Sequence, residues 1–192
     1  MKPKTIRKSI VCGCLALLLM SPFIGNAQYK GVTNQANPVQ PGSVTLNLGI
    51  GAGINYLDDY YYQPFGTKMA LEFGAFKAGP GTITFGPELG GSFSNGGYYD
   101  NYRVRTLVVA GRSAWHYGWN VRGLDTYGGF SLGMGFVHQE YVSDADYISN
   151  QTIFVPGAFV GASYFISRNF GFNTEAGFDI TNIQFGVIFK LQ

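Results

Sequence analysis

Apolar and polar residues alternate with a period of two along most of the chain beyond residue 42. The clearest segment runs from Ser43 to Asn55, where every odd position holds Ser, Thr, Asn or Gly. Its even positions carry the apolar set Val44, Leu46, Leu48, Ile50, Ala52 and Ile54. Alternation of this kind predicts a β-strand with one apolar and one polar face.

Seven more segments repeat this alternation. They span residues 69–75, 83–93, 106–116, 125–136, 152–164, 171–180 and 183–191. Val108 breaks the pattern of the fourth strand, and Ile180 extends the apolar face of the seventh. The sixth segment fits either parity; we place Phe154 and Val160 on its apolar face, which turns Phe159 toward the polar one. Eight strands are an even number, as bacterial single-chain membrane barrels require.

The connections between these strands are alternately long and short. The long ones are 56–67, 94–103 and 138–151, and the short ones are 77–81, 117–123 and 166–170. Long loops outside the cell and short turns in the periplasm are typical of outer-membrane barrels. A tight turn at 180–182 forms the fourth outer connection. Residues 28–42 lack periodicity and are expected to form a periplasmic lead-in.

The N-terminus carries the features of an export signal. Four basic residues within positions 2–8 precede an apolar run over 10–20, and small residues end at Ala27. This order predicts a secretory signal peptide over 1–27. The apolar run is shorter than the roughly 20 residues that a membrane-spanning helix needs. Cys12 and Cys14 are both in the signal, which leaves no thiol chemistry after cleavage.

Cleavage would also change the charge of the chain. Nine Lys and Arg would remain against 11 Asp and Glu, for a net charge of −2. No basic stripe survives to bind nucleic acid. Charged residues make up only 12% of the sequence, whereas soluble proteins average about 25%. A water-exposed surface would therefore be short of charge.

The polar face of the predicted strands indicates which side meets lipid. It is rich in Gly, Ser, Thr and Asn, which suits the narrow lumen of a barrel of about eight strands. The apolar face then meets lipid. Isolated charges on the polar face are expected to form a structural network in the lumen: Glu72, Glu88, Arg112, Asp125, Glu175 and Lys190. We expect Arg112 to pair with at least one of the glutamates at 72, 88 and 175, because a guanidinium facing lipid is costly.

Motifs for catalysis or cofactor binding are lacking. The Gly-rich run 49–53 lies inside a strand, so it is no dinucleotide loop. Asp58-Asp59 and Asp144-Ala-Asp146 lack the spacing of a calcium loop. His116 and His138 are interpreted as lumenal and rim histidines with ordinary hydrogen bonds. We expect no catalytic residue, no cofactor and no metal site.

Residues 112–116, 125–135, 161–165 and 175–177 carry a family resemblance. Over these motifs the chain resembles small outer-membrane β-barrel proteins of the OmpA/OmpX type, across 43–192 and most strongly across 104–192. The resemblance implies an all-β, eight-stranded, antiparallel up-and-down transmembrane barrel. It also implies insertion by the outer-membrane assembly machinery, which reads the last strand. That strand usually ends on an aromatic residue, whereas here Phe189 is followed by three other residues.

Two classes of function fit these expectations. The first is a non-enzymatic structural or surface-interaction barrel in the cell outer membrane, with a lumen plugged by side chains. Its loops 56–67, 94–103 and 138–151 would contact lipopolysaccharide or a surface partner. The alternative is a membrane-embedded lipid-modifying hydrolase or acyltransferase. His138 with Ser143 or Ser149, and with Glu140 or Asp144, supplies the residue types for such an enzyme. An open pore would need about 16 strands.

Overall fold

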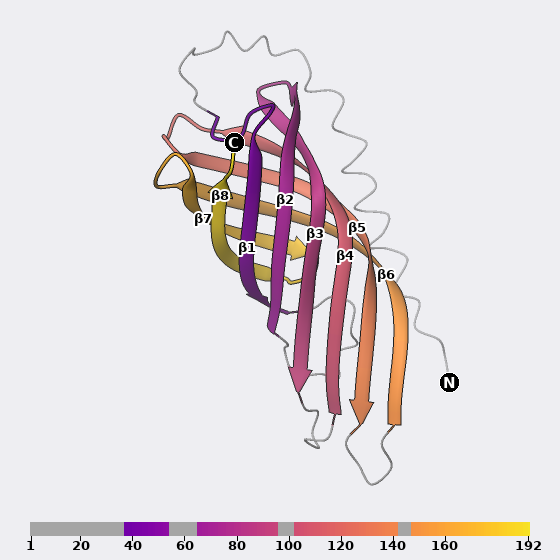
Figure 1. Ribbon diagram of the computed structural model, residues 1–192. Coiled ribbons are helices and arrows are strands. Elements are labelled where there is room, and N and C mark those ends of the chain that lie inside the picture. Colours follow the sequence, from indigo (N-terminus) through magenta and orange to yellow (C-terminus); the bar gives the residue numbers. More distant parts are fainter. Residues whose placement is uncertain (1–36, 54–64, 96–101, 142–146) are drawn as a thin grey trace, which may run out of the picture. The chain divides into compact units, whose positions relative to one another are not determined.

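Eight antiparallel strands close into one barrel. The computed structural model describes residues 37–53, 65–95, 102–141 and 147–192. Each strand pairs with its neighbour in sequence, and the last pairs with the first (Figure 1). The strands are β1 (Val44–Ala52), β2 (Phe65–Ala78), β3 (Gly81–Asn95), β4 (Tyr102–Gly118), β5 (Leu124–Tyr141), β6 (Tyr147–Phe165), β7 (Phe170–Phe178) and β8 (Ile183–Lys190). The predicted up-and-down barrel is confirmed. No helix in the described ranges is long and apolar enough to cross a membrane.

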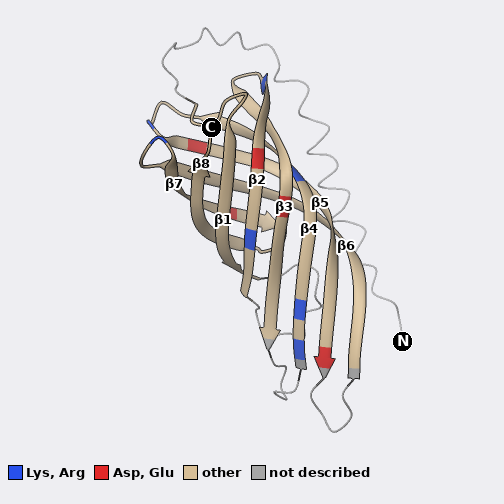
Figure 2. Ribbon diagram, viewed as in Figure 1, with Lys and Arg blue, Asp and Glu red and all other residues tan. Residues whose placement is uncertain are grey.

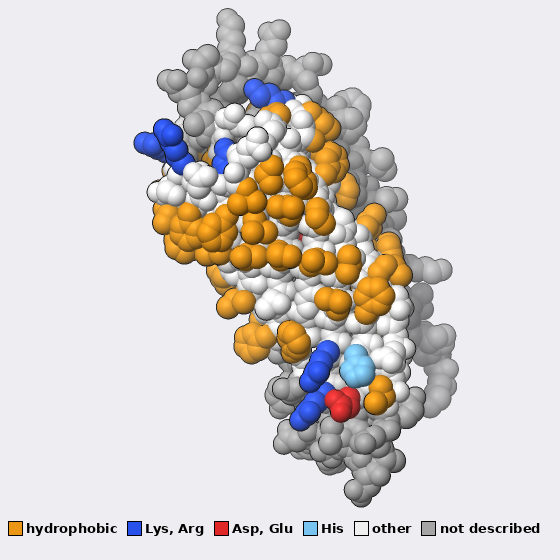
Figure 3. All heavy atoms as spheres, viewed as in Figure 1, with side chains coloured by type: hydrophobic (Ala, Val, Ile, Leu, Met, Phe, Trp, Pro, Cys, Tyr) orange, Lys and Arg blue, Asp and Glu red, His pale blue; other side chains and the backbone are white. Residues whose placement is uncertain are grey.

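The predicted faces of the strands are also confirmed, apart from the end of the seventh. In β1, Thr45 and Asn47 are buried in the lumen, while Leu48 and Ile50 lie on the exterior. In β6, Phe154 and Val160 are each 64% exposed and Phe159 is only 4% exposed, which settles the parity of that strand. Large apolar side chains thus lie outside the barrel and form the belt seen in Figure 3. Such an exterior is suited to lipid and would aggregate in water.

Aromatic residues lie on the exterior near the short turns. Trp115 stacks on Tyr117, and Tyr117 meets Trp119 edge to face. The indole of Trp115 donates a hydrogen bond to the carbonyl of Ala78. Tryptophan and tyrosine with one apolar and one hydrogen-bonding side prefer the boundary between lipid and water. These residues mark the short-turn end of the barrel, which we call the terminal end because β1 starts and β8 finishes there (Figure 1).

At the opposite end, which we call the loop end, the strands are longer than predicted. Residues 65–67 belong to β2, β4 already starts at Tyr102, and only residues 142–146 separate β5 from β6. The predicted loops 56–67, 94–103 and 138–151 were therefore too long. One reason is that several outward residues there are polar, such as Arg105 and His138, so the apolar alternation becomes irregular before the strands end. The loop residues 54–64, 96–101 and 142–146 lie outside the described residues, as does the predicted signal 1–27.

The predicted outward position of Ile180 is wrong. Strand β7 ends at Phe178, two residues earlier than expected, and the chain then turns into the lumen. Ile180 is fully buried there in a cluster with Val108 and Val155. Parity ceases to apply once the strand has ended. The same cluster explains why Val108 broke the pattern of β4: it faces inward and packs on this turn.

Residues 37–42 pack against the terminal end instead of extending away from it. Val39 is 1% exposed, and its carbonyl accepts a hydrogen bond from the hydroxyl of Thr82. The side-chain oxygen of Asn37 accepts a hydrogen bond from the amide of Gly118. A Cβ at position 74 would overlap the carbonyl oxygen of Gln40, so Gly74 is what allows this close approach. The described part of the expected lead-in thus caps the lumen.

An arginine introduced at Leu48 tests the lipid-facing assignment. We expect Leu48→Arg to lower the free energy of unfolding by about 2–4 kcal/mol, because a guanidinium near the bilayer midplane is poorly solvated. Urea unfolding of barrels folded into lipid vesicles would measure this loss. Val121→Arg, in the exposed turn between β4 and β5, is the matched control and should unfold like the wild type. Equal stability of the two variants would contradict the assignment.

Candidate functional site

Arg112 on β4 is the centre of a charged cluster in the lumen. Its Nε lies 2.9 Å from Glu72 of β2, its Nη1 2.8 Å from Glu88 of β3, and its Nη2 3.0 Å from Glu175 of β7. Its guanidinium carbon sits 3.9 Å from the ring centre of Phe159 on β6. One side chain therefore ties five strands together across the barrel. The fork of an arginine can make several directed bonds at once, which a lysine cannot.

Lys68 extends the cluster toward the loop end. Its ammonium is 2.8 Å from Asp179, 3.8 Å from Glu88, and also contacts Glu175. Asp179 accepts a second hydrogen bond, of 3.1 Å, from the hydroxyl of Ser131. Since Asp179 lies in the turn after β7, this ion pair fixes that turn inside the lumen. The turn and the charge cluster thus stabilise each other.

His116 extends the cluster toward the terminal end. Its Nδ1 lies 2.7 Å from Asp125, and its Nε2 lies 2.9 Å from Glu72. The ring stacks on Tyr127, whose hydroxyl donates to Glu175 at 3.1 Å. The hydroxyl of Thr84 also donates to Glu72, at 2.6 Å. Both ring nitrogens of the histidine are therefore occupied by carboxylates.

Five of the six charged residues predicted for the lumenal network do lie together, and one does not. Glu72, Glu88, Arg112, Asp125 and Glu175 are brought together as expected, and Arg112 contacts all three expected glutamates. Lys190 does not join them. Its ammonium donates to the carbonyl of Pro38 at the terminal end, 2.9 Å away, because β8 carries it beyond the charged part of the lumen.

Three residues of the cluster were missing from the expected network. His116 was expected in the lumen but not as an ion-pair partner. Asp179 was on the inward parity of β7 and was still left out. Lys68 precedes the predicted start of the second strand by one residue. Extending that strand toward the N-terminus would have put Lys68 inside by parity, next to the outward Met69.

Of the residues considered for lipid hydrolysis, His138 and Ser149 lie on opposite faces of the sheet, while Glu140 shares the outward face of β5 with His138. His138 faces outward from β5 and lies 2.8 Å from the side-chain oxygen of Asn150 on β6. Ser149 is the next residue on β6, so it points to the other face of the sheet. Ser143 and Asp144, like the aspartates at 58, 59 and 146, lie outside the described residues. The part of the chain that the structure describes also contains no cluster of His, Cys, Asp or Glu suited to a metal ion.

A second candidate site is the free edge of β6 at the loop end. Residues 147–164 of β6 pair with β5 without interruption. Pairing with β7 begins only at Ala158. In the ladder, residues 147–157 therefore have no strand partner on their β7 side within the described ranges. Figure 1 shows the same arrangement, with β3 to β6 reaching well past the β7–β8 turn.

Pro156 determines which backbone groups point to this edge. Proline has no N–H, and it sits opposite Leu132 within the continuous β5–β6 ladder. Its nitrogen must therefore face away from β5, toward the free edge. Residues of the same parity, including Asn150, Thr152 and Phe154, then direct their N–H and C=O groups to that edge. Unpaired edges of this kind are templates for another strand.

Comparison with known proteins supports the fold. No family model matches the chain, and no curated protein matches it in sequence. The solved structure of Neisserial surface protein A has a TM-score of 0.50 and 13% identity, and covers 78% of this chain and 96% of its own. The chain has the fold of small outer-membrane β-barrel proteins.

Two structures of the attachment invasion locus protein Ail of Yersinia pestis also align. One has a TM-score of 0.49 and 9% identity, over 79% of this chain and 96% of Ail. The other, in complex with the heparin analogue sucrose octasulfate, has a TM-score of 0.43 and 10% identity, over 77% and 93%.

Removal of Arg112 tests the role of the cluster. We expect Arg112→Ala to cost about 3–5 kcal/mol of folding free energy, because three buried carboxylates lose their shared partner. Arg112→Lys should recover only part of this loss, since one ammonium cannot reach all three. Lys190→Ala is the control and should change stability little. Urea unfolding in detergent micelles measures all three; equal effects of the two alanine variants would refute the assigned role.

Proposed function

We propose that this protein is a non-enzymatic outer-membrane barrel that binds extended polypeptide segments at the cell surface through the free edge of β6. The observation that carries this proposal is the eleven-residue stretch 147–157, which pairs with β5 and has no second strand partner among the described residues. A bound segment would add a strand to the sheet. Main-chain hydrogen bonds would then provide affinity, and alternate side chains would provide selectivity.

The apolar exterior supports the outer-membrane location. The belt of large apolar side chains needs lipid, and the predicted signal peptide would direct export. An open sheet edge is not stable within the hydrocarbon layer, so the part of the free edge on the loop side of Phe154, which includes Asn150 and Thr152, would lie beyond it. The loop end then faces outward and the terminal end faces the periplasm. Outer-membrane lipid and lipopolysaccharide would surround the barrel, and the outer-membrane assembly machinery would insert it.

The packing of the lumen argues against a transport role. Ion pairs occupy its middle, the turn after β7 enters it from the loop end, and residues 37–42 cover it at the terminal end. Both ring nitrogens of His116 contact carboxylates, which leaves neither of them free to take a proton from a hydroxyl nucleophile. These observations favour a plugged barrel whose function lies on its surface over the lipid-modifying enzyme.

Conductance measurements test the plugged lumen. We expect the purified barrel to give no large, steady current in planar bilayers, because the charged cluster and its two caps would block an aqueous path through the narrow lumen. Lys68→Ala, which loosens the turn after β7, should give at most small and unsteady openings. A reproducible channel of porin size in the wild type would contradict the proposal.

Proline substitution on the free edge tests the binding role. The probe is a pool of fluorescent ten-residue peptides with alternating apolar and polar residues, applied to intact cells that export the protein. We expect wild-type cells to retain part of the pool and Thr152→Pro cells to lose it, because the substitution removes an edge N–H without breaking the β5 ladder.

Thr152→Val is the matched control, since it keeps the N–H and the size of the side chain. It should retain peptides like the wild type. Labelling of an Asn150→Cys variant with a membrane-impermeant maleimide checks surface display, because the exported chain has no other cysteine after signal removal. Equal retention by the proline and valine variants, or none by the wild type, would rule out the edge as a binding site.

A further inference from the structure

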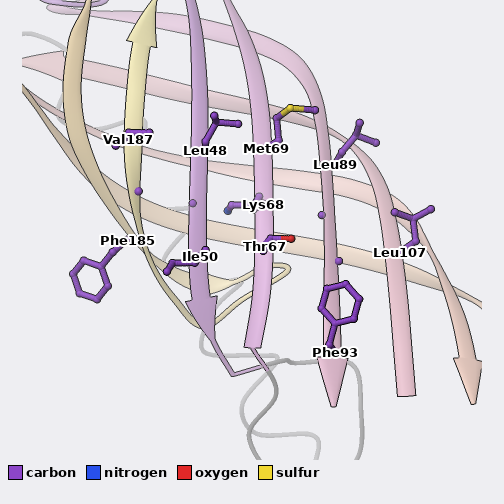
Figure 4. A pocket seen from close by; sticks show the side chains of 14 residues that line it. Leu48, Ile50, Thr67, Lys68, Met69, Leu89, Phe93, Leu107, Phe185 and Val187 are labelled. Carbon is purple, nitrogen blue, oxygen red and sulfur yellow. The ribbon is translucent and has the colours of Figure 1, made fainter. Parts of the chain in front are cut away.

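A hollow of about 750 Å³ lies on the exterior wall over β8, β1, β2 and β3. Figure 4 shows the apolar side chains that surround it, with Leu48, Met69 and Leu89 toward the terminal end and Phe93 toward the loop end. Ile50 and Phe185 border it on one side and Leu107 on the other. The hollow is open to the surroundings of the barrel, and its walls are hydrocarbon.

The strand register explains why the wall is hollow at this place. Ile50, Thr67, Gly91 and Leu107 form one cross-strand row on the exterior. The two middle members are small, so the row is low between the large side chains at its ends. The next row toward the terminal end, Leu48, Met69 and Leu89, is uniformly large. The depression is therefore built by side-chain size at Thr67 and Gly91.

Two arginines of β4 lie next to the hollow, on the side that faces the loop end of the barrel. Arg105 lies opposite Phe93 and two residues before Leu107, on the same face of β4. That spacing is about 7 Å along the strand. Arg103 follows on the same face, and both are exposed. Within the described ranges no carboxylate lies within salt-bridge distance of either guanidinium, although Glu140 faces Arg103 in the ladder.

The neighbouring strands complete this charged margin. His138 lies opposite Arg105 on β5, and its ring contacts Asn150 on β6. Figure 3 shows the basic side chains, the histidine and one acidic side chain just beyond the apolar belt, and Figure 2 shows the two basic positions at the loop end of β4. A polar, net basic margin thus meets an apolar hollow.

We propose that the hollow and Arg105 together bind a phosphorylated acyl lipid of the outer leaflet, with one acyl chain in the hollow and a phosphate on the guanidinium. The combination favours a lipid over a protein partner. A second copy of the chain would bring its own apolar belt, which offers no anion for Arg105. In a lipid the phosphate lies nearer the membrane surface than the acyl chain. The wall has the matching order, with Arg105 on the loop side and the apolar hollow on the terminal side. Arginine is also well shaped to bind phosphate oxygens in pairs.

This inference relies on the proposed function only for the membrane location. Binding is measured with purified barrel in zwitterionic detergent micelles by native mass spectrometry. The probes are diphosphoryl lipid A, the same lipid A without its phosphates, and inorganic phosphate. Arg105→Gln removes the anion partner, and Thr67→Leu fills the hollow with an apolar side chain that suits a lipid-facing wall. Lys77→Gln and Ala176→Leu are the matched controls, at exposed positions away from the site.

We expect the wild type to prefer phosphorylated lipid A by roughly tenfold, as one charge-assisted hydrogen bond can provide. Arg105→Gln should abolish this preference, and Thr67→Leu should weaken both lipids alike. The two controls should behave as the wild type. An unchanged preference in Arg105→Gln, unchanged binding in Thr67→Leu, or displacement of the lipid by inorganic phosphate would overturn the proposal. Absence of lipid binding by the wild type would also overturn the proposal. Peptide retention at β6 is measured in a separate assay, so the proposed function could still hold in that case.

Discussion

A ring of only eight strands leaves a lumen just wide enough for side chains, and most of the interior is organised by that constraint. A charged group that points inward cannot reach bulk water, and an unpaired charge there is costly. Arg112 meets the constraint by contacting carboxylates from three other strands, while Lys68 and His116 do the same nearer the two ends. Ion pairs therefore hold the middle of the interior, together with small apolar clusters such as the one around Ile180, while most large apolar residues lie on the exterior.

Alternation predicts this arrangement well because a strand offers only two faces. It is enough to place Arg112 with Glu72, Glu88 and Glu175 inside the barrel, although these residues are far apart in sequence. It also turns Phe159 inward, where the ring lies under the guanidinium. The closed ring makes this inference strong: once parity puts several charges inside a narrow lumen, few geometries remain in which they are not neighbours.

Parity fails where a strand begins or ends. Ile180 follows the pattern of β7 in sequence, yet the strand has already ended and the residue is buried. Lys68 was missed for the opposite reason, because β2 starts before its apolar alternation becomes regular. The strands at the loop end share this property: Arg105, His138 and Asn150 face outward beyond the belt, so the backbone ladder continues where the apolar pattern has stopped. The end of a strand is set by where backbone pairing stops, and the pattern of apolar and polar residues predicts that position poorly.

The loop end is the part of the barrel whose strands the sequence pattern predicted least well. It is also the part where Arg105 and the edge of β6 can still bind a ligand. Inside the barrel, the charged side chains of the cluster are paired with one another. At the loop end, the row Arg105, His138 and Asn150 joins the arginine margin of β4 to the free edge of β6 across β5. A lipid on β4 would occupy the exterior wall, whereas an added strand would lie beside β6 in the plane of the sheet. The two ligands would therefore not compete for space, and a lipid held at Arg105 would stabilise the sheet whose far edge receives the strand.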